Sequence, residues 1–358
     1  MSDAESERGM HTVPVLREVL RAARRPTWRL ILDWALTAAG IGIAVWRLAP
    51  TLAAVDDLSA RLAHLRWVWF GVAVVAAVVS LGLYGELYRR MLAAGGARLK
   101  FGTVQAVNFI GNSLAQTVPS AGSTAGMAYA VAAFRIRGVD TGLSLWTAVL
   151  AALLTAVVLV VLGPLAFAYN GVIPVPAAWA LCAALALAVW VLWLLLRRPQ
   201  SLHWIARGTT AVARHLPVVR NMQWARTESH RADAISERIA LLRPTVAEWS
   251  DFFLIGLVSW GLDYLTLVAC VKAAADTVPW AAVAVGYLLV QASIGLQLTP
   301  AGAGPAEAGL LAALVAGGLA APNAAVAVVL FRFITWPLLA STGWLVFLGN
   351  AWKRTSRS

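Results

Sequence analysis

The sequence is poor in charge, since Asp, Glu, Lys and Arg make up only 13% of its 358 residues. A soluble domain carries about 25% charged and about 45–50% apolar residues. Here 60% of the residues are hydrophobic, and the mean hydropathy is +0.73. A soluble protein of this composition could not cover its surface with polar groups. Several runs reach the roughly 20 apolar residues of a membrane-spanning helix. The sequence therefore predicts an all-α, polytopic integral membrane protein.

Other absences narrow the function. The two cysteines, Cys182 and Cys270, lie inside apolar runs, which favours helix packing over a disulfide or a metal pair. The five histidines fall in loops or interfacial segments without metal-ligand spacing. No nucleophile elbow, paired carboxylates or phosphate-binding loop occurs. We therefore predict no metal or other cofactor, and a transporter rather than an enzyme.

The net charge of +12 does not indicate nucleic acid, because no nucleic-acid-binding motif accompanies it. Cytoplasmic loops of membrane proteins collect Lys and Arg. Residues 1–29 form a predicted basic cytoplasmic arm, in which residues 13–25 alternate apolar and Arg positions. Two explanations of this alternation stay open: an amphipathic helix on an anionic lipid surface, or positive-inside charge alone. No signal-peptide cleavage pattern precedes the first apolar run.

The remaining chain divides into two membrane halves, 30–196 and 250–350, joined by a basic interfacial linker, 197–249, and followed by a cytoplasmic tail, 351–358. About six full spans are predicted from the apolar runs. They are Leu30–Ala49, Trp67–Tyr88, Leu143–Tyr169, Ala177–Leu196, Phe252–Val271 and Asn323–Asn350. Basic residues place the linker and both termini in the cytoplasm. The predicted location is the cytoplasmic membrane.

Two further apolar segments, 101–134 and 280–321, are each interrupted by Pro, Gly and Ser or Thr near the middle. These interruptions divide each segment into two short helices. Charge alone is compatible with re-entrant hairpins or with paired full crossings, and the interruptions favour re-entry. Aligning Pro119 with Pro300 pairs Gln116 with Gln297, and the neighbouring spans also correspond. The halves therefore predict an inverted-topology repeat, an arrangement common in secondary transporters.

The interruptions are the predicted substrate site. The N-termini of two half-helices that meet near the midplane would favour an anion such as a phosphate headgroup. The candidate residues are Ser120, Gly122, Ser123 and Thr124 in the first interruption, and Thr299, Gly302 and Gly304 in the second. The alternative for the small residues is close helix packing.

Ionisable residues inside spans are costly, so each is a functional candidate. Glu307 begins the helix after the second interruption, and Arg332 lies inside the last span. The two could pair with each other, or either could face a cavity. Asp263 lies deep in its span, where gating or proton transfer and structural pairing are both open.

The second interruption resembles a known family. The stretch Thr299 to Ala308, followed by Gly317-Gly318, Ala324–Val328 and Arg332, is similar to the C-terminal half of certain flippase-like membrane proteins. They are related to the transmembrane domain of lysylphosphatidylglycerol synthetase, and their pattern is a Gly-rich turn, a Glu, and an Arg one span later. The segment from Asn112 to Gly126 is similar to the other signature of that family. It departs from that signature because Ser123, Thr124 and Tyr129 replace the glycine-rich turn and the basic residue that follows it.

The resemblance covers nearly the whole chain and implies lipid translocation. The expected substrate is an anionic or aminoacylated phospholipid, or a polyprenyl-phosphate-linked sugar. Family members with a soluble synthetase domain carry it after the membrane part. Because this sequence ends at Ser358, a separate synthase or glycosyltransferase is expected to supply the substrate. The alternative is a membrane scaffold for such a transferase, with the linker 197–249 as its docking surface. A membrane-embedded transferase ranks last, because no polar catalytic cluster is found.

Overall fold

The computed structural model describes residues 65–117, 122–148, 173–196, 244–296 and 299–355, with scattered positions between 150 and 168. These residues form helices and turns and include no strand, which confirms the all-α prediction. The predicted arm 1–29, the span Leu30–Ala49 and most of the linker 197–249 lie outside the described residues. The span Leu143–Tyr169 is described mainly at its start, where residues 141–148 are helical.

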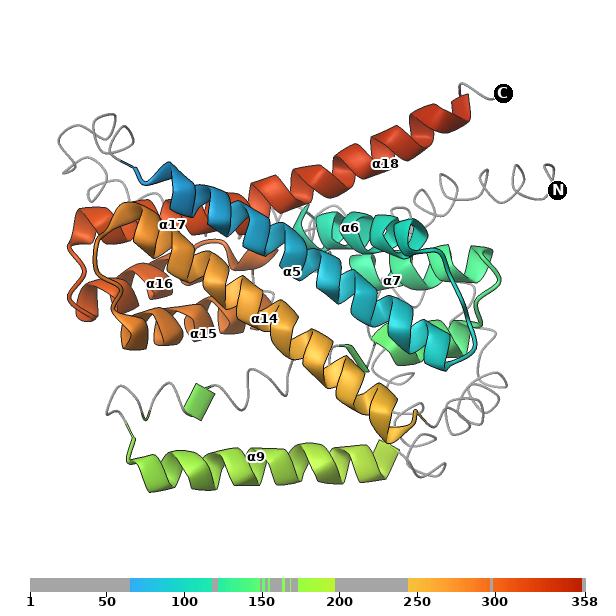
Figure 1. Ribbon diagram of the computed structural model, residues 1–358, viewed down its shortest axis with the longest axis horizontal. Coiled ribbons are helices and arrows are strands. Elements are labelled where there is room, and N and C mark those ends of the chain that lie inside the picture. Colours follow the sequence, from blue (N-terminus) through green and yellow to red (C-terminus); the bar gives the residue numbers. More distant parts are fainter. Residues whose placement is uncertain are drawn as a thin grey trace, which may run out of the picture.

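Three helical segments among the described residues are long and apolar enough to cross a membrane. They are α5 (Trp67–Ala94), α14 (Val246–Ala274) and the segment Ala321–Asn350. This third segment combines α17 (Ala321–Phe333), a π-helical turn (Ile334–Leu338) and α18 (Leu339–Thr355). Each coincides with a predicted span and has wider bounds. A fourth helix, α9 (Val175–Leu196), covers the predicted Ala177–Leu196 and lies along one side of the molecule (Figure 1).

The start of α14 is set by local capping. Thr245 precedes the helix, and its Oγ1 accepts a hydrogen bond from the Glu248 backbone N–H at 3.3 Å. The Glu248 carboxylate in turn accepts from the Thr245 N–H at 2.7 Å. This reciprocal capping box satisfies two N–H groups that a helix start leaves unpaired. The helix therefore begins at Val246, inside the predicted linker 197–249, rather than at Phe252.

The helices α5 and α14 pack along each other and run antiparallel (Figure 1). At one end the Arg66 N–H donates to the Ala273 carbonyl oxygen at 3.2 Å, and at the other Arg90 pairs with Asp251. Midway, the Ser80 hydroxyl donates to the Ser259 carbonyl oxygen at 2.8 Å, and the Ser259 hydroxyl donates to the Ser80 carbonyl oxygen at 2.9 Å. The crossing is thus held by the same contact in both directions, a local two-fold arrangement.

Each interrupted segment forms two short helices that pack on each other. The first holds α6 (Phe101–Thr117) and α7 (Gly122–Ile136), and the second holds α15 (Trp280–Leu296) and α16 (Pro305–Ala316). These helices have 12 to 17 residues, or about 18 to 26 Å at 1.5 Å per residue. That is shorter than the roughly 30 Å hydrocarbon core of a bilayer.

The two helix pairs lie at opposite ends of the α5–α14 crossing (Figure 1). The first pair follows the C-terminal end of α5, and the second follows the C-terminal end of α14. Since α5 and α14 are antiparallel, the pairs approach the centre from opposite sides. Against α6 lies α18, where a β-carbon on Gly343 would overlap the Phe109 carbonyl oxygen.

Replacing Gly126 with alanine is expected to weaken the α6–α7 pair. A β-carbon there would overlap the backbone carbonyl oxygen of Gly111 and lie 3.3 Å from the Ala115 β-carbon. Overpacking of this kind costs about 1–3 kcal/mol, which thermal unfolding in detergent micelles would detect. The control is Gly102→Ala on exposed α6 surface, where no atom lies within 4 Å of the new carbon. Equal melting temperatures for the two variants would contradict the packing described here.

Candidate functional site at the helix-pair tips

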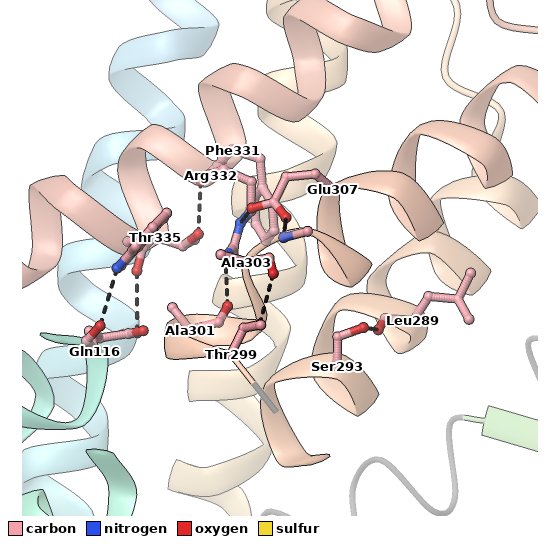
Figure 2. Close-up of polar contacts among 12 residues, drawn as sticks. Gln116, Leu289, Ser293, Thr299, Ala301, Ala303, Glu307, Phe331, Arg332 and Thr335 are labelled. Atoms are coloured by element: carbon pink, nitrogen blue, oxygen red, sulfur yellow. Dashed lines mark hydrogen bonds and ion pairs between the residues drawn. The ribbon is translucent and has the colours of Figure 1, made fainter. Parts of the chain in front are cut away.

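A buried ion pair joins the second helix pair to the last span. Arg332 of α17 donates from Nε to Glu307 Oε1 of α16 at 2.6 Å. The two residues are 5% and 7% exposed, so the pair is largely removed from solvent. Of the two sequence-based expectations for these residues, the pairing is the one that the structure shows. Figure 2 shows Arg332 directed at Glu307 and at the turn before α16.

The other oxygen of Glu307 caps its own helix. Its Oε2 accepts a hydrogen bond from the Gly304 backbone N–H at 2.6 Å, at the N-terminus of α16. Pro305 at the first helical position has no N–H to satisfy. A carboxylate is favoured at this positive end of the helix dipole. The anion predicted for this helix start is therefore supplied by the protein itself, and Glu307 links the cap to Arg332.

The turn before α16 has an unusual backbone. The backbone φ values are +51° at Ala301, +69° at Gly302 and +97° at Gly304. Residues other than glycine seldom adopt positive φ values. A β-carbon on Gly302 would lie 3.0 Å from backbone atoms of Ser293 and Ile294 in α15. The Thr299 hydroxyl closes the turn by donating to the Ala303 carbonyl oxygen at 2.7 Å. The glycines are thus needed for both conformation and close packing.

This turn aims one carbonyl group at Arg332. The Ala301 carbonyl oxygen accepts from Arg332 Nη2 at 2.6 Å (Figure 2). With the bond to Glu307, two of the five guanidinium N–H groups are engaged by described residues. The guanidinium carbon also lies 5.6 Å from the centre of the Trp336 ring, a cation–π distance. Three N–H groups therefore remain for which the described residues provide no partner.

The tip of the first helix pair reaches the same place. The end of α6 contacts the turn Pro300–Gly302. Near that end, the backbone carbonyl oxygen of Gln116 accepts a hydrogen bond from Trp336 Nε1 at 3.2 Å. The side-chain Nε2 of Gln116 donates to the Thr335 backbone carbonyl oxygen at 3.5 Å. Both tips therefore meet beside Arg332 (Figure 2).

The π-helical turn at this junction was not predicted. Pro337 lies inside the last span, and a proline removes a backbone donor and crowds the preceding turn. A wider π turn accommodates it, and such turns are frequent at functional sites. The sequence does contain a signal for this π-helical turn, because a proline lies inside a predicted span, five residues after Arg332.

The candidates of the first interruption are only partly described. Ser120 lies outside the described residues, as does Gln297 of the second interruption. Gly122 is buried at the start of α7, where a β-carbon would overlap the Ala115 carbonyl oxygen. Ser123 and Thr124 are exposed in the first turn of α7. Gly122 thus fits the packing explanation, whereas Ser123 and Thr124 lie on the outer surface of the helix pair.

A stripe of amides along α6 was also missed, although its spacing is readable in the sequence. Gln105, Asn108, Asn112 and Gln116 recur every three or four residues and so share one helix face. Gln105 and Asn108 donate to the carbonyl oxygens of Gly82 and Leu81 in α5, each at 2.7 Å. Gln105 Oε1 and Asn112 Nδ2 are buried without a partner among the described residues. These amides therefore line one face of α6 up to its C-terminal end, and two of them have a buried polar atom without a described partner.

The described residues contain no group of three His, Cys, Asp or Glu side chains that could hold a metal ion. The third ionisable candidate, Asp263, stands apart from Glu307 and Arg332. Its Oδ2 accepts from the Tyr287 hydroxyl at 2.7 Å and from Gln291 Nε2 at 2.9 Å, both on α15. The structure therefore brings Glu307, Arg332, Gly302, Gly304 and Thr299 together, and gives Asp263 a separate place.

Comparison with known families agrees with these features. The family model described as the lysylphosphatidylglycerol synthase TM region matches residues 19–342 of the 358. The chain belongs to this family. No curated protein and no solved structure shows a significant match. Membership confirms the resemblance found in the sequence, and together with the apolar helices it shows a membrane-embedded protein with a lipid-related role.

Proposed function

We propose that this member of the lysylphosphatidylglycerol synthase TM region family moves a lipid across the cytoplasmic membrane. The substrate is an anionic or aminoacylated phospholipid, or a polyprenyl-phosphate-linked sugar, and no covalent chemistry is involved. The observation that carries the proposal is the buried Arg332, with three N–H groups facing no described partner, at the junction of both helix-pair tips. A guanidinium group is well suited to bind phosphate through paired N–H groups.

The arrangement of the two helix pairs supports this proposal. Antiparallel α5 and α14, joined by reciprocal serine contacts, give the two helix pairs opposite directions of entry. Helices of 12 to 17 residues fit re-entrant hairpins that end near the midplane better than full crossings. We therefore propose an inverted-topology repeat with both termini in the cytoplasm, in which each side of the membrane has its own hairpin leading to Arg332. Such symmetry is the usual basis of alternating access.

The charges suggest how a headgroup is held. Glu307 and Arg332 neutralise each other while the site is empty, so the empty protein carries no net charge there. An arriving phosphate would bind the remaining N–H groups of Arg332, with Glu307 keeping the guanidinium in position. The amide stripe on α6 would supply hydrogen bonds along the approach to the site. The hydroxyls of Ser123 and Thr124, exposed in the first turn of α7, would add donors at the start of that helix.

A scaffold role is the second candidate, because the basic linker 197–249 offers a docking surface for a separate synthase or glycosyltransferase. The two functions predict different sensitive regions. Translocation depends on Arg332 and Glu307. Scaffolding depends on the arginines of the linker and leaves the buried pair free to vary, provided that the protein folds.

The proposal predicts that purified protein in liposomes moves one lipid class between leaflets. Headgroup-labelled anionic, aminoacylated and polyprenyl-phosphate lipids would be tested in turn, and a membrane-impermeant quencher would report the accessible label. One class should become accessible faster than in protein-free liposomes. Substitution of four linker arginines should leave that rate unchanged. No movement of any class by correctly inserted protein would contradict translocation and favour the scaffold.

A further inference from the structure

We infer that Asp263 binds the proton whose movement drives translocation, an inference that rests on the proposed function. Asp263 lies 11 residues before the C-terminal end of α14 (274 − 263), or about 16 Å along the helix. This depth is near the middle of a span. Both hydrogen bonds that it accepts, from Tyr287 and Gln291, fall on Oδ2. Its second oxygen, Oδ1, accepts none from the described residues.

No described cation compensates an ionised Asp263. Among the described elements, α5, α15 and α17 pack most extensively against α14. Leu150 and Ala151, which cluster with Phe252 of α14, carry no titratable group. On α15 the only titratable side chain is Tyr287, which donates to the carboxylate. On α17 the only titratable side chain is Arg332, which forms an ion pair with Glu307. The charged groups of α5 and of the start of α14 pair with one another or with local caps; they are Glu86, Arg89, Arg90, Asp251 and Glu248.

The remaining titratable groups on these helices supply no second cation at this depth. Lys272, nine residues further along α14 (272 − 263), lies over the Trp69 ring at 6.0 Å. Cys270 and the tyrosines Tyr84, Tyr88 and Tyr264 are neutral in their ordinary protonation states. An isolated carboxylate at membrane depth is costly, so Asp263 is stabilised by taking up a proton. An O–H bond forms on Oδ1 with a proton from a hydronium ion of the aqueous phase, which is left as water, and the side-chain charge changes from −1 to zero.

Proton binding would loosen the link between α14 and α15. Hydrogen bonds to a charged carboxylate are roughly twice as strong as those to a neutral group. The Tyr287 and Gln291 contacts should therefore weaken when Asp263 is protonated. Around these side chains, the rings of Trp260 and Tyr264 pack edge-on against Tyr287 at 6.2 and 5.5 Å. A change at Asp263 thus acts on a packed contact between two helices.

A short series of contacts leads from this link to the substrate site. From Gln291, α15 continues to Ser293 and Ile294, against which Gly302 packs. The same turn places the Ala301 carbonyl oxygen on Arg332. Because α15 ends at this turn, a shift of α15 changes the donors that Arg332 offers to a phosphate. The protonation state of Asp263 and the occupancy of Arg332 are then coupled, and each must bias the other equally.

Two measurements on the full-length protein test the inference. Infrared difference spectra between mildly acidic and mildly alkaline buffer report the protonated carboxyl group directly, without any lipid substrate. The second measurement is translocation in liposomes with and without an imposed pH gradient. The test variant is Asp263→Asn, which mimics the protonated side chain. The control is Asp251→Asn, the same change at the more exposed carboxylate that pairs with Arg90 at the start of α14.

We expect the wild type and Asp251→Asn to show a titrating carboxyl band that Asp263→Asn lacks. A gradient of one pH unit should change the transbilayer lipid ratio by up to about tenfold per proton moved. Asp263→Asn should keep downhill movement and lose this response. Wild-type translocation that ignores the gradient, or an Asp263→Asn variant that still follows it, would overturn the inference. If no lipid moves but the band depends on Asp263, the proton site is supported and only the proposed transport fails.

Discussion

Replacing Arg332 with glutamine is expected to abolish translocation and to destabilise the protein. The change leaves Glu307 without its cationic partner in a site where both residues are buried. Removing one partner of a buried pair costs about 3–5 kcal/mol. The loss of a charged contact to phosphate should slow translocation at least about thirtyfold, equivalent to about 2 kcal/mol. Thermal unfolding in detergent and the liposome assay measure the two effects separately.

The double variant Glu307→Gln with Arg332→Gln separates structure from function. Both charges are removed together, so no uncompensated charge remains, and such replacements of a buried pair are often close to neutral for stability. We expect its melting temperature to recover most of the loss, while translocation stays as low as in Arg332→Gln. A double variant that is both stable and fully active would show that the pair is structural only.

Replacing Gly304 with alanine is expected to impair the site through the backbone. Gly304 has φ +97° and ψ −76° and donates its N–H to Glu307. Residues forced into sparsely populated regions cost roughly 1–3 kcal/mol. A displaced turn would also release Glu307 and move the Ala301 carbonyl group away from Arg332. We expect translocation per folded molecule to fall about tenfold, or about 1.4 kcal/mol.

The matched control is Gly318→Ala. Gly318 follows the other end of the same helix with φ +90°, and no atom lies within 4 Å of a β-carbon there. Alanine is therefore disfavoured by a positive φ at both positions, but Glu307 and Arg332 are untouched by the change at Gly318. Gly318→Ala should lower the melting temperature without changing translocation per folded molecule. Equal losses of translocation in both variants would mean that the position of Gly304 next to the site has no special role.

Much of the fold could be predicted because membrane helices are long and apolar. The runs in α5, α14 and the last span identified three helices directly, and Pro and Gly located the interruption between α15 and α16. Helix ends were less certain, since they depend on local caps. The Thr245 and Glu248 pair moved the start of α14 to Val246, and the π-helical turn around Pro337 was hidden inside an apolar run.

The candidate site was predictable in its residues and less so in its contacts. The cost of burying charge in a membrane is enough to single out Glu307 and Arg332 in the sequence. Their pairing was one of two options, because charge alone does not show which way each side chain points. The position of Gln116 and Trp336 depends on how two distant segments meet. That arrangement follows from the α5–α14 crossing, and local sequence does not encode it.

We propose above that the junction at Arg332 carries lipid across the membrane. The most direct measurement compares headgroup accessibility in liposomes containing the wild type or the Glu307→Gln and Arg332→Gln double variant, at equal amounts of folded, inserted protein. We expect rapid exposure of one phosphate-bearing lipid class by the wild type and a rate at the protein-free level for the double variant. Equal rates for both proteins, or no movement by the wild type, would contradict it.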